Sequence, residues 1–150
     1  DICTGGGCIA IAMGHYNPDW NVDAVDLSPE ALSLAHENAE RLDARNVTLH
    51  HGDLYGPLTG RHYDLIVTNP PYVTNAETDA LPAEYAHEPE MALRAGDDGL
   101  DLVLKILRDA PLHLRKNGVL ICEVGESQQH LERLLPDVPF AWIEFKVGQM

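Results

Sequence analysis

Four consecutive residues, Asn69-Pro70-Pro71-Tyr72, combine an amide side chain, two prolines and an aromatic ring. They follow residues 63–68, a short run rich in β-branched and aromatic residues that predicts a buried strand. Each proline fixes φ and lacks an N–H, so the backbone leaves the strand stiffly and its carbonyls stay free to accept hydrogen bonds. Ligands of open α/β sheets bind at the carboxyl ends of strands. The stretch is therefore suited to hold a planar group that bears an NH₂.

A glycine turn near the start of the chain predicts a second binding element. Residues 1–13 pass from a strand end, through three glycines, into a short apolar helix. Gly5, Gly7 and Ala10 have the spacing G-x-G-x-x-A, in which the glycines permit a tight turn and close approach of a ligand to the backbone. The small third residue lets the helix pack closely on the sheet. The motif favours a nucleotide-like ligand, although many such loops are only turns.

Acidic residues follow the next two predicted strands, residues 21–26 and 47–53. Asp26 lies 21 residues after Gly5, and an acidic residue at about this distance accepts the hydroxyls of a ribose. A solvated turn carboxylate is the alternative interpretation of Asp26. Parallel strands would bring Asp1, Asp26 and Asp53 to one edge of the sheet. Such an acidic crevice suits a cationic ligand better than a pyrophosphate.

The remaining elements complete an alternating α/β pattern. Ser28 and Pro29 are the predicted N-cap and first position of a helix, and a second helix is expected over residues 99–115, with Pro111 kinking or breaking its last part. Residues 119–124 are apolar enough for a strand covered on both faces, Ser127 would cap a short helix, and residues 140–145 alternate as a strand does. The helix after Ser28 has an apolar face of Leu32, Ala35, Ala39 and Leu42.

Residues 73–98 are polar, acidic and without clear periodicity. A connection this long in a compact domain is usually functional or disordered. Within it, Tyr85, His87 and Glu88 cluster before a proline. We interpret the segment as a lid on the substrate side, and a packed loop without a function is an equally good interpretation.

The length of 150 residues favours one domain, and the formal net charge of −14 constrains its partners. An acidic surface repels a phosphate backbone and attracts a basic protein, so direct nucleic-acid binding is not expected. No segment of the sequence predicts a membrane span or a signal peptide. The chain opens inside a glycine loop and ends on a strand pattern without a partner, so we expect a catalytic domain, residues 1–150, that is truncated at both ends.

The cysteines and histidines do not predict a metal site. Cys3, Cys8 and Cys122 are odd in number and lack metal-ligand spacing, so buried free thiols in a reducing cytoplasm are expected. His50 and His51 are adjacent in a predicted strand, where neighbouring side chains point to opposite faces and cannot chelate one ion together.

Together, residues 1–7, Asp26 and Asn69-Pro70-Pro71-Tyr72 resemble the class I S-adenosylmethionine-dependent methyltransferases, within them the group that methylates amide or amino nitrogen. More narrowly, residues 84–89, 120–125 and 138–142 look like the bacterial ribosomal-protein glutamine methyltransferases, which modify large-subunit ribosomal protein three. The resemblance implies a doubly wound, Rossmann-like α/β sheet of seven strands and an N-terminal substrate-binding domain that this chain lacks. The family usually has glycine where this chain has Cys3.

The resemblance also implies roles for individual residues. The cofactor S-adenosylmethionine would be bound by Asp1, Thr4, Gly5, Gly7, Asp26, Asp53, Leu54 and Asn69. Asn69 and Pro70 would accept the N–H groups of the target amide, and Tyr72 would pack against it. The substrate side would further include Pro71, Tyr85, His87 and Glu88.

Four alternatives remain open from the sequence. The nearest is a glutamine methyltransferase of peptide-chain release factors, which shares the tetrapeptide that begins at Asn69. An adenine-specific DNA methyltransferase would use the same grip on a flipped base, but this chain shows no basic stripe. A nicotinamide-binding oxidoreductase domain and a non-catalytic binding fragment are the other two.

Overall fold

A computed structural model of the chain describes residues 1–71 and 100–143. Its elements are the strands β1 (Val22–Asp26), β2 (Val47–His51), β3 (Tyr63–Thr68) and β4 (Leu114–Cys122), the α-helices α1 (Cys8–Tyr16), α2 (Pro29–Arg41), α5 (Asp101–Asp109) and α6 (Gln128–Leu134), and the 3-10 turns η1 (Gly56–Leu58), η3 (Ala110–Leu112) and η4 (Gly125–Ser127).

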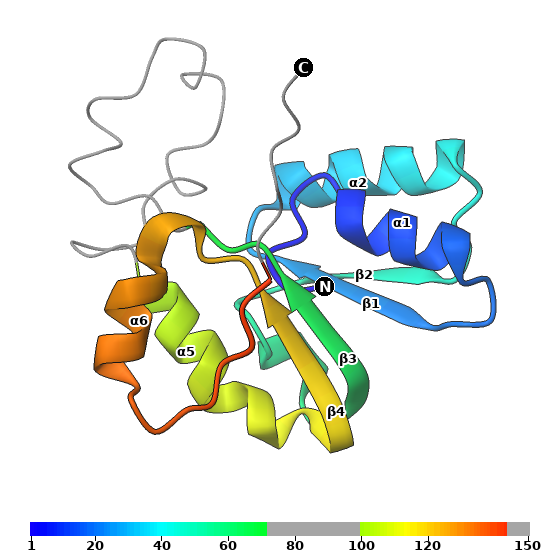
Figure 1. Cartoon of the computed structure of the whole chain (residues 1–150). Coiled ribbons are helices and arrows are strands. Elements are labelled where there is room, and N and C mark those ends of the chain that lie inside the picture. Colours follow the sequence, from blue (N-terminus) through cyan, green and yellow to red (C-terminus); the bar gives the residue numbers. More distant parts are fainter. Residues whose placement is uncertain (72–99, 144–150) are drawn as a thin grey trace, which may run out of the picture.

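The strands form a parallel array in which the first residues of the chain lie between two strand pairs. β1 pairs with β2 and β3 pairs with β4, both in parallel. Ile2 joins the two pairs, because it forms parallel bridges with Val25 of β1 and Thr68 of β3. The lateral order is therefore β2-β1-Ile2-β3-β4. All carboxyl ends share one edge, and in Figure 1 the arrowheads of β1, β3 and β4 point toward the segment that precedes α1.

Helices cover both faces of this sheet, as the predicted doubly wound fold requires. On one face, Ala10 of α1 packs with Val22 and Ala24 of β1. On the opposite face, Ile106 of α5 belongs to the core cluster that contains Val25. Successive strand residues point to opposite faces, so adjacent positions of β1 serve different layers. Figure 1 shows α1 and α2 on one side of the strands and α5 and α6 on the other.

The start of α2 forms as the sequence predicts. The Ser28 hydroxyl accepts a hydrogen bond from the Ala31 N–H at 3.1 Å, and Pro29 occupies the first helical position. Ala35 is completely buried against the sheet side. Leu42, expected on the same apolar face, is 56% exposed, because the helix ends at Arg41 and Leu42 leaves the helical path.

Asp23, near the amino end of β1, accepts hydrogen bonds from several other segments of the chain. Its carboxylate accepts hydrogen bonds from His50 at 2.7 Å and from Arg61 and Tyr63 at 2.8 Å. Burial alone would raise the pKa of the Asp23 carboxyl, but these hydrogen bonds hold it below its usual value. His51 instead lies beside the Leu27 carbonyl, so the two neighbouring histidines have separate partners.

The predictions between residues 99 and 124 need correction. The α-helix expected over residues 99–115 ends at Asp109, and the predicted break at Pro111 is confirmed, because Pro111 lies in the turn η3 and β4 already begins at Leu114. β4 bulges before it reaches the predicted strand, because Leu114 pairs with Tyr63 whereas Val119 pairs with Leu65. Side-chain positions on one face of β4 are about half exposed, with Val119 at 53% and Ile121 at 45%, so the expectation of cover on both faces is wrong. The strand also ends earlier than predicted, at Cys122 instead of residue 124.

The predicted strand over residues 140–145 is not formed at residues 140–143. There Phe140 and Trp142 pack on the cluster of α5 and α6 side chains, with ring centroids 5.3 Å apart. Both rings pack on the same hydrophobic cluster.

Several predicted residues lie outside the described part of the chain: Tyr72, Tyr85, His87 and Glu88, together with the expected lid of residues 73–98. Within residues 1–71 and 100–143, no helix is both long and apolar enough to span a membrane.

Candidate active site

Asp26 connects the glycine turn to the start of α2. The Gly5 N–H donates to Asp26 Oδ2 at 2.8 Å, and the Ser28 N–H donates to Oδ1 at 2.9 Å. The pair Gly5 and Asp26, predicted from a spacing of 21 residues, is therefore in direct contact. Each carboxylate oxygen can accept more than one hydrogen bond, so both keep lone pairs for the hydroxyls of a ligand.

The glycine turn uses left-handed backbone at three positions: Cys3 (φ +58°), Gly5 (+54°) and Gly7 (+82°). This conformation costs an L-residue about 1–2 kcal/mol, which gives a physical reason for a glycine at the position of Cys3 in the family that the chain resembles. A Cβ on Gly5 would meet no atom within 4 Å, whereas a Cβ on Gly7 would lie 2.9 Å from Ile11 Cδ1 and 3.1 Å from Ala35 Cβ. Gly5 is thus open to a ligand, and Gly7 is required for helix packing.

We expect Gly7→Ala to lower the melting temperature more than Gly5→Ala does. Both substitutions place a side chain at positive φ, at a cost of about 1–2 kcal/mol, but only the Gly7 methyl also collides with packed side chains. Thermal unfolding followed by circular dichroism measures the difference. Gly56→Ala is the matched control, because its Cβ would enter open space without positive φ. Equal shifts for the two loop variants would contradict this account of Gly7.

The carboxyl end of β2 places Asp53 beside Asp26. The Gly52 N–H donates to the Asp26 carbonyl at 3.0 Å, and the chain then turns through the exposed Asp53. Leu54 adopts φ +44° and packs against the core cluster that contains the buried Tyr55. The ends of β1 and β2 are therefore neighbours, and the acidic crevice expected between their carboxylates stays a prediction.

Asp1 and Thr4 are bound to each other inside the loop. The Thr4 hydroxyl donates to Asp1 Oδ2 at 2.6 Å, and the same oxygen accepts from the Ala10 N–H at 3.1 Å. Asp1 Oδ1 is buried and has no hydrogen-bond partner in the described structure. A buried carboxylate oxygen without a partner is unfavourable, so the loop fits a ligand that brings a cationic or N–H group.

The residues after β3 differ in accessibility. Asn69 is exposed, Pro71 is half-buried, and Pro70 is less than 2% exposed. The Pro70 ring therefore anchors the turn, and Asn69 presents the accessible polar group. On one flank the Ile2 N–H donates to the Val67 carbonyl at 2.9 Å, so this turn begins beside the strand that leads into the glycine loop.

Asn38 is a contact of the loop that sequence reasoning missed. Its Nδ2 donates to the Gly6 carbonyl at 2.9 Å, which ties α2 to the middle of the turn. The available signal was its spacing: Asn38 lies three residues after Ala35 and so shares the inner face of α2.

Two of the three thiols, those of Cys3 and Cys122, are poor nucleophiles. Burial raises the pKa of both Cys3 and Cys122 to about 12, so both stay protonated near neutral pH. Cys3 and Cys122 are half-buried and Cys8 is exposed, which corrects the expectation that all three thiols are buried. Among the described residues, no group of three or more His, Cys, Asp or Glu side chains is arranged to hold a metal ion.

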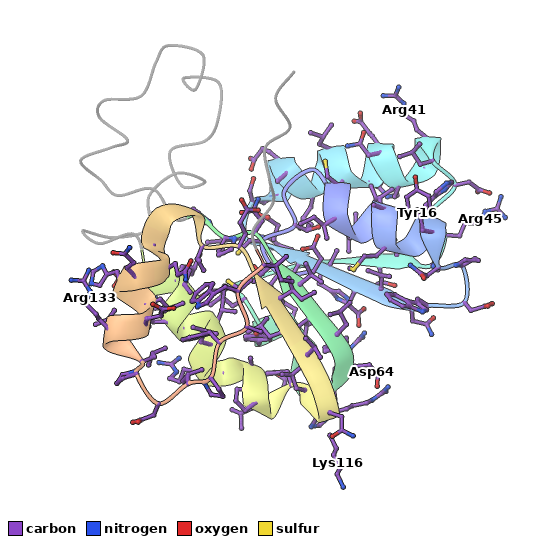
Figure 2. The ribbon with its side chains drawn as sticks, viewed as in Figure 1. Tyr16, Arg41, Arg45, Asp64, Lys116 and Arg133 are labelled. Atoms are coloured by element: carbon purple, nitrogen blue, oxygen red, sulfur yellow. The ribbon has the colours of Figure 1, made fainter. Side chains whose placement is uncertain are left out.

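The basic side chains labelled in Figure 2 are distributed over several parts of the molecule. Figure 2 shows Arg41 and Arg45 pointing outward at the end of α2 and in the turn that follows it, Lys116 at the bulge of β4, and Arg133 on α6. Arg45 is 86% exposed and pairs with Asp43 at 2.6 Å. The labelled cations thus occupy separate elements and do not form one stripe.

The parallel order with Ile2 at its centre, the glycine turn held by an acidic residue, and the Asn-Pro-Pro sequence after β3 define a class I methyltransferase fold. The fold is also that of the hMettl16 catalytic domain, solved in complex with the MAT2A 3′UTR hairpin 1, with a TM-score of 0.62 and 19% sequence identity over 92% of this chain and 55% of that one. The model of the family "Methyltransferase small domain" matches residues 1–96, and the chain belongs to this family.

Curated relatives with high identity share one description. The chain is 73% identical over its whole length to the ribosomal protein uL3 glutamine methyltransferase of Xanthomonas campestris pv. campestris, and 70% identical to that of Xylella fastidiosa strain 9a5c. A relative of the same description from Francisella tularensis is 46% identical over 99% of the chain. The chain spans 48–49% of the length of these relatives.

Proposed function

We propose that this chain carries the catalytic site of an S-adenosylmethionine-dependent methyltransferase that modifies a glutamine side chain of ribosomal protein uL3. One observation carries the proposal: the turn at Asn69 begins next to the strand residue, Ile2, that leads into the glycine loop. A group held by Asn69 would therefore lie close to a cofactor held by Gly5 and Asp26. The names and the identity of the relatives support the choice of substrate.

The described residues fit S-adenosylmethionine. The open side of Gly5 permits close approach of the cofactor, Asp26 keeps lone pairs for ribose hydroxyls, and the orphaned Asp1 Oδ1 suits an ammonium group. Asp53 and Leu54 would flank the adenine. S-adenosylmethionine, when bound, supplies a methyl group that its sulfonium charge already activates.

The residues of this chain would then have to orient the target carboxamide nitrogen toward the methyl group. A carboxamide nitrogen is poorly nucleophilic, because its lone pair is delocalised into the carbonyl. The Asn69 side-chain oxygen would accept one N–H of the target glutamine and the Pro70 carbonyl the other, which orients the nitrogen and stabilises the positive charge that develops on it. No base has to act before transfer, since the proton can leave afterwards. Because Pro70 is buried and Asn69 is exposed, Asn69 would be the more accessible of the two acceptors.

The charge of the chain supports a basic protein as substrate. With 24 acidic and 10 basic residues, the chain attracts a cationic surface and repels phosphates. This balance favours a ribosomal protein over a flipped DNA base, and the separate positions of the labelled cations agree with it.

The deciding experiment compares two protein substrates. A protein that contains this chain, made at the length of its curated relatives, is incubated with methyl-labelled S-adenosylmethionine and either uL3 or a peptide-chain release factor. We expect label on a glutamine of uL3, mapped by mass spectrometry, and none on the release factor. Label on the release factor alone would reverse the choice of substrate. A thermal shift with NAD but not with S-adenosylhomocysteine would instead favour an oxidoreductase.

A further inference from the structure

Thr68, the last residue of β3, joins the two halves of the candidate site. It is 1% exposed, and its hydroxyl donates to the Ile2 carbonyl at 2.8 Å. Its own carbonyl accepts from the Glu123 N–H at 3.0 Å, which fixes it to the end of β4. The side chain of Thr68 thus binds Ile2 on one side of β3, and its carbonyl binds Glu123, next to β4, on the other side.

The hydrogen bond of the Thr68 hydroxyl lies between the segment that leads to Asn69 and the segment that leads to Gly5. Asn69 is the next residue after Thr68, and Gly5 is only three residues after Ile2. In the middle of the sheet, the connection between β1 and β3 runs through Ile2. The Thr68 hydroxyl therefore constrains the separation between the glycine loop and the turn at Asn69.

We propose that Thr68 is a positioning residue that sets the distance between the turn at Asn69 and the glycine loop, an inference that rests on the proposed function. Methyl transfer requires the nitrogen and the methyl carbon in line at near-attack distance. A misplacement of about 1 Å can reduce such a rate by about 100-fold. Valine replaces threonine with nearly the same shape but without the hydroxyl, so Thr68→Val leaves the buried Ile2 carbonyl without this donor.

The test uses two matched pairs of side chains in a protein of the relatives' length. Threonine and Thr68→Val differ in the hydroxyl while the branched shape is kept, and Thr68→Ser and Thr68→Ala differ in the hydroxyl after the methyl is lost. We expect Thr68→Val to lower kcat for glutamine methylation at least tenfold, with KM and the Kd for S-adenosylmethionine changed less than threefold. Thr68→Ser should keep kcat within threefold. If Thr68→Val does not fold, kcat of Thr68→Ala at least tenfold below that of Thr68→Ser is the expected result.

Melting temperatures separate positioning from stability. Thr68→Ser loses packing and Thr68→Val loses a hydrogen bond, so both should melt earlier than the unsubstituted protein, yet only the loss of the hydroxyl should lower kcat. Thr48→Val, at an exposed position of β2, is the control for the substitution itself. A kcat for Thr68→Val within threefold of the unsubstituted value, or an equal fall for Thr68→Ser, would overturn the role of Thr68 alone. Absence of transfer by the unsubstituted protein would overturn the proposed function and this role with it.

Discussion

Asn69→Ala should reduce the rate of glutamine methylation by about 100- to 1,000-fold, which is the typical effect of removing one preorganised group that stabilises charge in a transition state. The accessible side-chain oxygen of Asn69 is, in our proposal, an acceptor for the target N–H. Its loss leaves the developing positive charge on nitrogen without that acceptor. In our proposal S-adenosylmethionine is bound mainly by Gly5 and Asp26 and only to a small extent by Asn69, so the Kd measured by calorimetry should change by less than about twofold.

The control for this substitution is Asn21→Ala, an exposed asparagine at the other end of β1. It removes the same amide group far from the carboxyl ends of the strands, and methylation should stay at the unsubstituted rate. If Asn69→Ala lost cofactor binding and transfer to the same extent, Asn69 would be a cofactor ligand or a structural residue. The assignment of Asn69 to the target amide would then be wrong.

Asp26→Ala should weaken the binding of S-adenosylmethionine by about 1–3 kcal/mol, the usual cost of leaving buried hydrogen-bonding groups without a partner. The structure adds a second contribution, because Asp26 also accepts the N–H groups of Gly5 and Ser28. The variant therefore loses both the ribose acceptor and the connection between the glycine turn and α2. We expect a lower affinity by calorimetry together with a lower melting temperature.

Asp26→Asn separates these two contributions. An asparagine side chain keeps one acceptor oxygen but replaces the other with an NH₂ group, which cannot accept from a backbone N–H or a hydroxyl. It should weaken cofactor binding while it destabilises the fold less than alanine does. Unchanged cofactor affinity in both variants would remove Asp26 from the site.

The sequence predicted those parts of the fold in which local chemistry and tertiary packing agree. β1 and β3 lie within one residue of their predicted bounds and α2 begins at the predicted Pro29, because a β-branched run, a Ser-Pro helix start and a double proline each favour one local structure. The spacing of Gly5 and Asp26 agrees with their contact in the structure, since a βαβ unit of this length returns the chain beside its own first turn, but the hydrogen bond itself was not predicted.

Other parts depended on contacts between residues distant in the chain. The bulge that begins β4 at Leu114 forms because this residue pairs with Tyr63, about 50 positions earlier in the chain, which no local pattern reveals. The sequence around Phe140 and Trp142 has the alternating pattern of a strand, yet both rings pack on the hydrophobic cluster that contains residues of α5 and α6. The contacts of Asn38 and Thr68 with the loop likewise join positions more than 30 residues apart.

The sequence by itself determined which residue types lie at the ends of the strands. These include the glycines that permit left-handed backbone and the amide and carboxylate side chains of the candidate site. These features are local, since they depend on side-chain type and on φ. Only the tertiary structure decided how the groups are spaced, because the bridges from Ile2 to Val25 and to Thr68 set β1 near β3 and the buried hydroxyl of Thr68 binds the Ile2 carbonyl between them. Distances between separate segments arise from packing and long-range hydrogen bonds, which a linear pattern does not contain.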